Sequence, residues 1–538
     1  MADQHQQGAG PANSLADYDL STPISTTQGG LRQGLTSYGD AHFSLFLRKV
    51  FIKALGYSDD ALSRPIIGIV NTYSSFNPCH ANIPQLIEAV KRGVQLNGGL
   101  AVDFPTISLH ESFSSPTSMY LRNLMSMDTE EMIAAQPCDA VVLIGGCDKT
   151  TPAQLMGGIS ANKPILHLVT GPMMPGSHKG VRIGACTDCR NNWASFRAGT
   201  IDIEDISAIN DELAPTAGTC GVMGTASTMA CILVALGLMP FKGASAPAVS
   251  SARLRIAEET GANAVRAFRQ QLRPQTVLTR DSFLNAITVL QAIGGSTNAV
   301  VHLMAIVNRH PGVAGTITLD TVDAIGRTTP LLVDLKPSGD KYMTDFHDAG
   351  GMAASAAKDA RLLRHAGPAV VFAGAADLAR RIDDPALDVT PDSVLVLQNI
   401  GPVGNPGMPE AGLIPIPRKL AARGVLDMLR VSDGRMSGTA GGTISVLGIV
   451  RTGDIITCDV DCRVIRVELS DEEIQRRVRE KKETLEREEA KEGAAPGPWT
   501  ARKTIRGYRG LYMRSVNQAQ QGADFDFLTA AGPRGGQE

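Results

Sequence analysis

The 538-residue sequence has few aromatic residues, no marked charge bias and no long apolar run. Aromatic residues make up 4% of the chain, and the formal net charge at pH 7 is −3. This balance gives no electrostatic basis for binding nucleic acid or an anionic membrane. No uninterrupted apolar run reaches the ~18 residues typical of a membrane-spanning helix, so we expect none. The 43% apolar and 20% charged residues are typical of a globular protein instead.

The N-terminus also lacks the features of a targeting sequence. It carries Asp3, Asp17 and Asp19, and no Lys or Arg precedes Arg32. A mitochondrial transit peptide is rich in Arg and poor in acidic residues, and a secretory signal contains an apolar stretch. We therefore expect a cytoplasmic protein in which residues 1–30 form a polar, disordered lead-in.

Nine cysteines without a secretion signal argue against a disulfide scaffold. Cys186 and Cys189 form a CxxC in GACTDCR, a pattern compatible with half a zinc site or with a redox dithiol. No second CxxC and no suitable pair of histidines follows at a zinc-like spacing, which disfavours zinc. Cys458 and Cys462 lie in an expected pair of strands, and we interpret them as structural.

Two domains are expected, because a chain of this length usually exceeds one hydrophobic core. Residues 31–360 alternate short apolar strands with helical segments, which is typical of a parallel α/β domain. From residue 366 onward, short β-branched runs between Gly, Pro and Asp turns predict a smaller β-rich domain over 366–538. Within it, the charged run 470–493 predicts a helix, and a solvated surface helix is favoured over a partner-binding arm.

Three cysteines lie in loops that follow strand-like or glycine-rich segments: Cys79, Cys147 and Cys220. Such loops usually form the ligand site of an α/β sheet, and thiolates are suitable ligands for iron–sulfur clusters. Gly146 and Gly218 would let the backbone approach a bulky group. Taken singly, however, each cysteine is also compatible with a small buried apolar residue. Spacing alone leaves both interpretations open.

Eight blocks of sequence carry a more specific pattern. They are NTYSSFNPCHANIPQL, FPTISLHESF, GGCDKTTPAQLMGG, GTCGVMGTASTMA, AIGGSTNAVVHL, GNPGMPEAG, SDGRMSGTAGG and RGYRGLYMRSVNQAQQGADFDFL. In this order they resemble the dehydratase family that includes dihydroxy-acid dehydratase, phosphogluconate dehydratase and the sugar-acid (aldonate) dehydratases. The resemblance runs from about residue 30 to about residue 528. It implies a large parallel α/β domain followed by a smaller β-barrel-like domain.

The resemblance assigns the three loop cysteines to a cofactor. Cys79, Cys147 and Cys220 fall on the family's three cluster ligands. Three protein ligands leave one iron with an open position, as a Lewis-acid cluster requires. The implied cofactor is an iron–sulfur cluster, with 2Fe–2S favoured over 4Fe–4S.

The resemblance also implies a magnesium site. Glu111, Asp148, Lys149 and Glu410 fall on the family's Mg²⁺ positions, and the family's lysine at this place is carbamylated. Carbamylation would turn a cation into an anionic oxygen ligand, which a hard ion such as Mg²⁺ prefers. Without the resemblance, Lys149 beside Asp148 would be interpreted as a surface ion pair.

Ser437 lies in SDGRMSGTAGG, a glycine-rich turn in which a serine commonly bonds its own backbone. The resemblance instead places it on the serine that the family is thought to use as an alkoxide base. In the implied mechanism Mg²⁺ holds the substrate carboxylate and C2 hydroxyl, Ser437 removes the C2 proton, and the open iron accepts the leaving C3 hydroxyl. The pKa of serine is too high for this role without the field of the metal. His80 is the alternative base.

The segment around Glu111-Ser112 favours the sugar-acid branch, since the branched-chain biosynthetic enzymes typically carry Asp followed by Gly there. We therefore expect a hydro-lyase that converts an aldonate such as L-arabinonate or D-xylonate to a 2-keto-3-deoxy acid. The alternative is the dihydroxy-acid dehydratase of branched-chain amino-acid biosynthesis. The partners implied are a small polyhydroxy acid and further copies of the chain in a homodimer or homotetramer, without nucleic acid or membrane.

Two segments are shorter than the family pattern. No GNLAP-like block separates 347–355 from 362–372, and a GGPLALV-like strand is missing near 447–448. Both places fall in the β-rich domain that carries Glu410 and Ser437. Losing strands from a barrel-like domain exposes edges and removes core. A non-catalytic paralogue or an incomplete chain is therefore the alternative from another class.

Overall fold

A computed structural model gives the fold and describes most of the chain. The residues described are 19–21, 23–24, 29–35, 40–185, 187–351, 364–402, 408, 414–425, 428–432, 449–459, 464–489 and 507–530. Glu410, Ser437, Cys186 and Cys462 lie outside these ranges. Within the ranges, no helix has the length and apolarity needed to cross a membrane, as the sequence predicted.

A parallel four-stranded sheet forms the centre of the N-terminal part. Its order is β2-β1-β3-β4, and every neighbouring pair is parallel. The strands are β1 (Ile66–Asn71), β2 (Leu100–Pro105), β3 (Ala140–Ile144) and β4 (Ile165–Leu168). All five residues of β3 are buried, as expected of a parallel strand covered on both faces. The parallel α/β architecture predicted from the sequence is confirmed.

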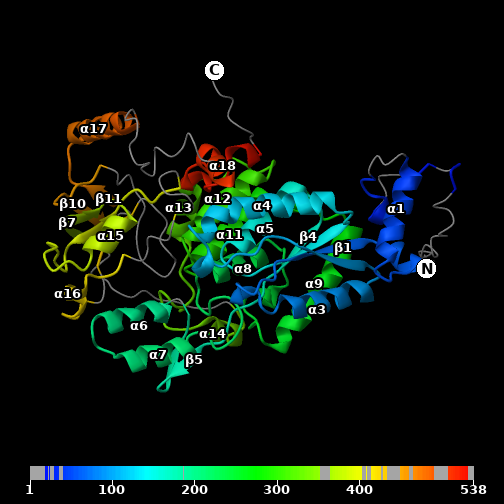
Figure 1. Ribbon diagram of the computed structural model, residues 1–538, viewed down its shortest axis with the longest axis horizontal. Coiled ribbons are helices and arrows are strands. Elements are labelled where there is room, and N and C mark those ends of the chain that lie inside the picture. Colours follow the sequence, from blue (N-terminus) through cyan, green and yellow to red (C-terminus); the bar gives the residue numbers. More distant parts are fainter. Residues whose placement is uncertain are drawn as a thin grey trace.

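Helices cover both faces of this sheet (Figure 1). On one face α3 (Ile83–Leu96) crosses α9 (Ser251–Arg269), and their apolar residues join those of β1 in one core. The crossing is tight, because a Cβ on Gly93 would lie 2.0 Å from the carbonyl oxygen of Glu258, and one on Gly261 would lie 2.3 Å from that of Val90. Larger side chains at these two glycines would separate the helices.

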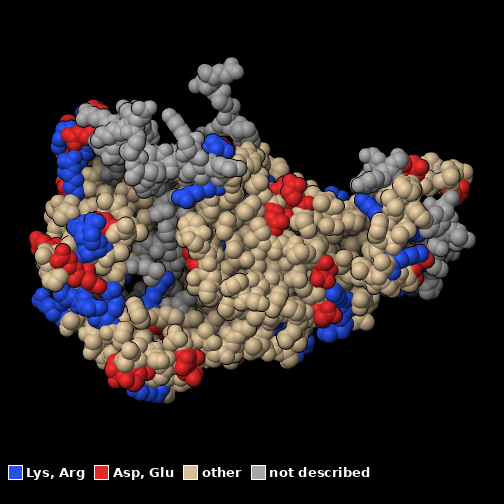
Figure 2. All heavy atoms as spheres, in the orientation of Figure 1, with Lys and Arg blue, Asp and Glu red and all other residues tan. Residues whose placement is uncertain are grey.

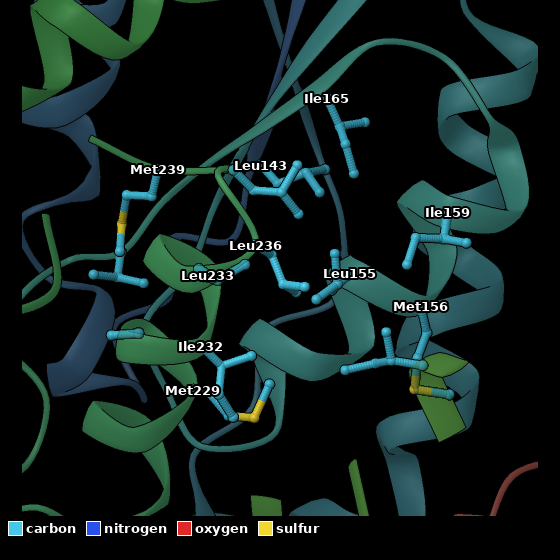
Figure 3. Packing of buried hydrophobic residues seen from close by; sticks show 14 of the residues in the cluster. Leu143, Leu155, Met156, Ile159, Ile165, Met229, Ile232, Leu233, Leu236 and Met239 are labelled. Carbon is cyan, nitrogen blue, oxygen red and sulfur yellow. The ribbon is translucent and has the colours of Figure 1, made fainter. Parts of the chain in front are cut away.

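The opposite face carries the larger core. It is formed by helices α4 (Ser118–Ala135), α5 (Thr150–Ala161), α8 (Thr225–Ala235), α11 (Arg280–Ala292) and α12 (Asn298–Arg309). Leu143 of β3, Leu155 of α5 and Leu233 of α8 lie together in this core (Figure 3). The expected break between two helical pieces at Gly294 is confirmed, since α11 ends and α12 begins around it; Gly294 has φ +56°.

Shorter elements connect and extend this domain. They are η2 (Gly30–Arg32), α1 (Ala41–Lys53), α2 (Asp59–Leu62), η3 (Pro78–His80), η4 (Glu111–Phe113), β5 (Gly176–His178), β6 (Val181–Ile183), α6 (Thr187–Arg197), α7 (Ile203–Glu212), η5 (Phe241–Ala244), α10 (Pro274–Val277), α13 (Leu319–Thr328) and α14 (Met343–Asp348). β5 and β6 form a separate antiparallel pair.

The β-rich part predicted after residue 366 is present as a second sheet. Its strands are β7 (Arg364–Phe372), β8 (Val394–Leu397), β9 (Arg430–Ser432), β10 (Ile455–Asp459) and β11 (Val464–Val467), in the order β11-β10-β7-β8-β9. β7, β8 and β9 are parallel, whereas β10 is antiparallel to both of its neighbours. Over the strands described, this mixed sheet ends at β9 and β11.

Three helices accompany this sheet: α15 (Ala375–Arg381), α16 (Arg418–Ala421) and α17 (Asp471–Glu489). α17 is the predicted charged helix. Its Arg477 forms a 2.6 Å ion pair with Asp454, which ties the helix to the turn before β10. Charged side chains of both signs gather over this part of the molecule, while the visible face of the central body is largely uncharged (Figure 2).

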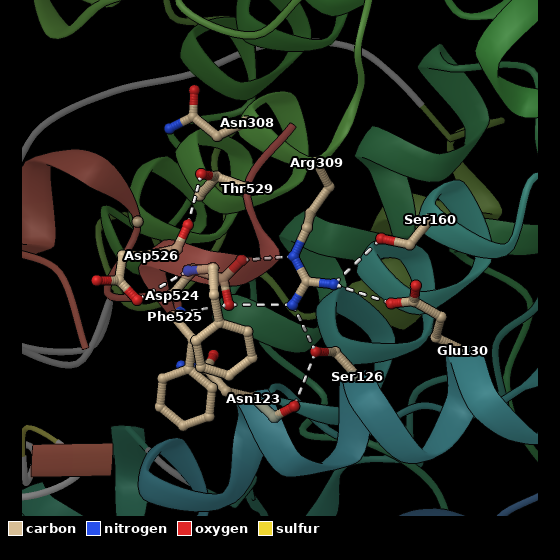
Figure 4. Close-up of polar contacts among 12 residues, drawn as sticks. Asn123, Ser126, Glu130, Ser160, Asn308, Arg309, Asp524, Phe525, Asp526 and Thr529 are labelled. Atoms are coloured by element: carbon tan, nitrogen blue, oxygen red, sulfur yellow. Dashed lines mark hydrogen bonds and ion pairs between the residues drawn. The ribbon is translucent and has the colours of Figure 1, made fainter. Parts of the chain in front are cut away.

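The C-terminal segment returns to the α/β part. It comprises α18 (Gly507–Ser515), η9 (Ala519–Gln521) and η10 (Asp526–Leu528). Arg309 at the end of α12 donates to both carboxylate oxygens of Asp524, at 2.6 and 3.1 Å, and both side chains are fully buried (Figure 4). Arg122 of α4 donates to the carbonyl oxygens of Gly522 and Ala523. These bonds join the last described segment to α4 and α12.

We predict that Asp524→Asn destabilises the protein, because it leaves the buried guanidinium of Arg309 without a full counter-charge. Breaking one side of a buried ion pair typically costs about 3–5 kcal/mol. The free energy of unfolding in denaturant, followed by circular dichroism, measures the effect. Asp323→Asn is the control: its i,i+4 pair with Arg327 is exposed, and such pairs contribute ~0.5 kcal/mol. Equal losses in the two variants would contradict the prediction.

Candidate active site

The carboxyl edge of the parallel sheet collects the predicted site residues. Cys79 follows β1, Glu111 follows β2 and Cys147 follows β3. The loop with Cys220 joins the same edge, because Thr219 forms a bridge with Pro172 just beyond β4. Loops at this edge are the usual ligand site of an open α/β sheet. Three strands thus bring Cys79, Glu111 and Cys147 to one edge, and the Cys220 loop is bonded to the backbone there.

Backbone bonds join the Cys220 loop to the Cys79 loop. Gly218 N–H donates to the carbonyl oxygen of Pro78 at 3.2 Å, and Thr219 N–H donates to that of Gly171 at 2.8 Å. Gly218 has φ +133°, and a Cβ there would lie 2.7 Å from the backbone nitrogen of Met173. Only glycine fits this conformation and this space, so a Gly is required two residues before the third cysteine.

The Cys79 and Cys147 thiols meet in the interior. Both side chains are buried. A hydrogen bond from Cys147 and a second interaction with His110 lower the pKa of Cys79 to about 6, although burial opposes the shift. The pKa of Cys147 is raised well above its usual value, first by its bond to Cys79 and then by burial. The lowered pKa of Cys79 favours the thiolate, the form that binds metal.

His80 connects the two cysteine loops. Its Nε2 accepts the N–H groups of Gly146 and Cys147 at 3.0 and 3.2 Å, so its proton lies on Nδ1, which is 2.8 Å from the carbonyl oxygen of Thr72. Burial lowers the pKa of His80 to about 4. The imidazole is thus neutral, with its acceptor nitrogen occupied by two backbone amides. His80 therefore does not fit the role of the alternative base, because the lone pair on its acceptor nitrogen is already bonded to two backbone amides.

Three of the four side chains predicted for magnesium lie close together. Lys149 is fully buried; its Nζ bonds Asp148 Oδ2 and lies 3.7 Å from Glu111 Oε2. Ser118 at the start of α4 donates to the same Glu111 oxygen. An unmodified Lys149 is thus a cation between two carboxylates. A carbamate at its place would instead create three adjacent anionic groups, a hard oxygen set that requires a divalent cation.

Some predicted features are incomplete in the part of the chain described. No three His, Cys, Asp or Glu side chains converge there as a metal site. The donor chemistry nonetheless fits the expected iron–sulfur cluster and Mg²⁺. The thiol pair and the third cysteine, whose loop is bonded to the Cys79 loop, would suit iron, and the carboxylate–lysine set beside them would suit Mg²⁺. Glu410 and Ser437 lie outside the described residues.

The sequence analysis missed several polar groups around Cys147. The hydroxyls of Thr150, Thr151 and Thr170 are buried without a hydrogen-bond partner among the described residues. Thr170 also explains why position 146 is a glycine, because a Cβ on Gly146 would lie 1.9 Å from the Thr170 hydroxyl oxygen. The glycine therefore makes room for a neighbouring loop. The threonines directly after Lys149 were a usable signal, whereas nothing near Thr170 in sequence indicated its role.

Comparison with known proteins agrees with this geometry. Residues 64–369 match the model for the N-terminal region of dihydroxy-acid/6-phosphogluconate dehydratases, and residues 344–523 match the model for the C-terminal region. The chain belongs to the dihydroxy-acid/6-phosphogluconate dehydratase family. It is therefore a dehydratase, that is, a hydro-lyase. Dehydratases of this family generally use an iron–sulfur cluster and Mg²⁺.

Individual relatives cover nearly the whole chain. The 6-deoxy-6-sulfo-D-gluconate dehydratase of Pseudomonas putida is 37% identical, over 88% of this chain and 92% of its own. The L-arabonate dehydratase of Azospirillum brasilense is 37% identical, over 91% and 95%. The dihydroxy-acid dehydratase of Moorella thermoacetica is 29% identical, over 88% and 96%. The alignment with the Azospirillum dehydratase spans 569 positions, so this 538-residue member of the family lacks segments that its relative has.

We predict that His80→Leu destabilises the Cys147 loop, because it removes the acceptor of the Gly146 and Cys147 N–H groups. The substitution leaves two buried N–H groups without an acceptor, and each such group costs about 1–3 kcal/mol. We expect a lower free energy of unfolding and less iron bound after reconstitution with iron and sulfide, measured by denaturation and by iron analysis.

The matched control is His167→Leu in β4. His167 is also buried, its pKa is lowered to about 3 by burial, and neither ring nitrogen has a partner among the described residues. Removing it deletes no hydrogen bond, so stability and iron content should stay close to wild type. If His80→Leu behaved like this control, the bridging role of His80 would be wrong.

Proposed function

We propose that this chain dehydrates a sugar acid, an aldonate such as L-arabinonate or D-xylonate, to the 2-keto-3-deoxy acid. The observation that carries the proposal is the adjacency of two donor sets: a buried thiol pair ends at Cys147, and a carboxylate–lysine set whose lysine is fully buried begins at Asp148. Soft and hard ligands on consecutive residues suit two different metal groups acting on one small substrate. The 37% identity to sugar-acid dehydratases, against 29% to a dihydroxy-acid dehydratase, supports the aldonate class.

Cys79, Cys147 and Cys220 would hold the iron–sulfur cluster, which we propose to be 2Fe–2S. The lowered pKa of Cys79 supports this assignment, because a metal ligand must lose its thiol proton. Neutral His80 and the bonded Gly218 turn keep the three loops in place without adding a competing charge. With three cysteines as ligands, the cluster would supply a Lewis acid toward a hydroxyl oxygen of the substrate.

Glu111, Asp148, carbamylated Lys149 and Glu410 would hold Mg²⁺. Carbamylation would convert the buried ammonium group of Lys149 into an anionic ligand beside Glu111 and Asp148, and the bound ion would stabilise that anion. When bound, the two metal groups supply Lewis acidity toward the carboxylate and hydroxyl oxygens of the substrate. Ser118 orients Glu111 through its hydrogen bond, and so fixes the oxygen that remains for a ligand.

Ser437 is the proposed base. Its Oγ would take the C2 proton, and the C2 electrons would form the double bond as the C3 hydroxyl leaves. The enol then becomes the 2-keto acid by protonation at C3. His80 does not compete for this role, because two backbone amides occupy its acceptor nitrogen.

We predict that Lys149→Arg abolishes turnover. Arginine keeps the positive charge and can still pair with Asp148, yet its guanidinium, which stays protonated, does not form the carbamate. Retained folding with less than one-hundredth of the wild-type rate is the expected result, measured as 2-keto acid formed per unit time at saturating Mg²⁺. Wild-type rates would exclude a modified lysine as a ligand.

The reaction itself is tested by a substrate series with the iron-loaded protein. We predict turnover of pentonates or hexonates in preference to 2,3-dihydroxyisovalerate. Ser437→Ala is the matched variant: it should keep the visible absorption of the cluster and lose turnover by orders of magnitude. Preference for 2,3-dihydroxyisovalerate would identify the branched-chain activity instead. A coloured protein without turnover on any substrate would identify a non-catalytic paralogue.

A further inference from the structure

A compact polar triad lies beside the candidate active site, between α6 and the segment that links α13 to α14. Lys336 Nζ donates to Asp188 Oδ1 and to the hydroxyl oxygen of Tyr342, both at 2.7 Å. The Tyr342 hydroxyl in turn lies 2.7 Å from Asp188 Oδ2, to which it donates. The Lys336 and Asp188 side chains are 15% and 10% exposed, and Tyr342 is 3% exposed. Each of the three side chains bonds the other two.

Neighbouring groups hold the triad in one arrangement. Gly184 N–H donates to Asp188 Oδ2 at 2.9 Å, so the second carboxylate oxygen has two donors. The Arg182 guanidinium and the Lys336 ammonium lie 4.9 and 4.5 Å from the centroid of the Tyr342 ring, distances typical of cation–π contacts. A Cβ on Gly184 would lie 2.8 Å from this ring. The Tyr342 ring is therefore fixed by the hydrogen bonds of its hydroxyl, by the cation–π contacts on its face and by the close backbone of Gly184.

Backbone groups of Lys336 and of Met343, the residue after Tyr342, form hydrogen bonds with the Cys220 loop. Met223 N–H donates to the carbonyl oxygen of Lys336, and Met343 N–H donates to the carbonyl oxygen of Gly221, both at 2.8 Å. These two bonds hold residues 221–223, directly after the cysteine. The residue before it, Thr219, is bonded to the end of β4. The loop is thus bonded on two sides, to the segment after β4 and to the backbone of the segment that carries Lys336 and Tyr342.

We propose that Asp188, Lys336 and Tyr342 are positioning residues that fix the Cys220 loop for cluster binding. The inference rests on the proposed function, in which Cys220 is the third cluster ligand. A turn that carries a metal ligand and lacks regular hydrogen bonds needs such external support, because ligand geometry must hold within a few tenths of an ångström. The triad supplies it through charge-assisted bonds, which are stronger than neutral ones.

Tyr342→Phe tests the inference, since it removes one hydroxyl and keeps the ring. The protein is reconstituted with iron and sulfide, and loss of visible absorption is followed after an iron chelator is added. We expect loss at least ~10-fold faster than in wild type, the usual scale for changes in groups that support metal ligands. In the cluster-free protein, hydrogen exchange at the amides of Met223 and Met343 should also become faster, a result that does not depend on metal.

Tyr508→Phe is the matched control. This tyrosine is partly buried, and its hydroxyl also makes two hydrogen bonds, with Tyr120 O and Leu124 N, but in the C-terminal contact with α4. It should lower stability to a similar degree and leave the chelator rate unchanged. Equal chelator rates in the two variants would overturn the positioning role. If wild-type protein and Cys220→Ser both fail to take up a cluster, it is the proposed function that fails, whatever Tyr342→Phe does.

Discussion

The parallel pairing of β1 with β2 and β3 is the constraint on which the site depends. Buried backbone N–H and C=O groups must be paired, and parallel strands can satisfy this only if each is followed by a crossover that returns to the other edge. All four strands therefore end at one edge of the sheet. The cysteines and carboxylates occupy the loops at that edge, so their convergence is a consequence of strand direction.

Burying charge is the second physical theme of this molecule. Lys149 is fully buried between two partly exposed carboxylates, and Arg309 and Asp524 are both fully buried. Such charges are costly unless every one is paired and hydrogen-bonded. A buried pair therefore tolerates few alternative arrangements of the elements that carry it. Arg309 of α12 also bonds Glu130 of α4 and Ser160 of α5, and these two helices follow directly after the Glu111 and Lys149 loops.

Neutral groups near the thiols complement these charges. His80 bonds two backbone amides as an uncharged acceptor, and the Thr150, Thr151 and Thr170 hydroxyls surround the same loop. A cationic imidazole at this place would alter the charge of any anionic group held by the cysteines. Burial keeps His80 neutral, so His80 holds the Cys147 loop through hydrogen bonds without adding charge. The charge of the site then comes from the cysteines and carboxylates.

The sequence by itself determined the architecture of the α/β part, the β-rich second sheet, the charged helix α17 and the membership of a dehydratase family. These follow from local periodicity and from short motifs, which act over a few residues. It also placed Cys79, Cys147 and Cys220 in loops, and the family resemblance implied Glu111, Asp148 and Lys149; the loops of all six meet at one edge of the sheet in the structure. Only the tertiary structure decided which nitrogen of His80 carries the proton, that Asp188 meets Lys336 and that Asp524 meets Arg309. The partners in the two pairs are 148 and 215 residues apart. A local sequence pattern cannot predict such a contact, because the packing of the helices and strands between the two residues brings them together.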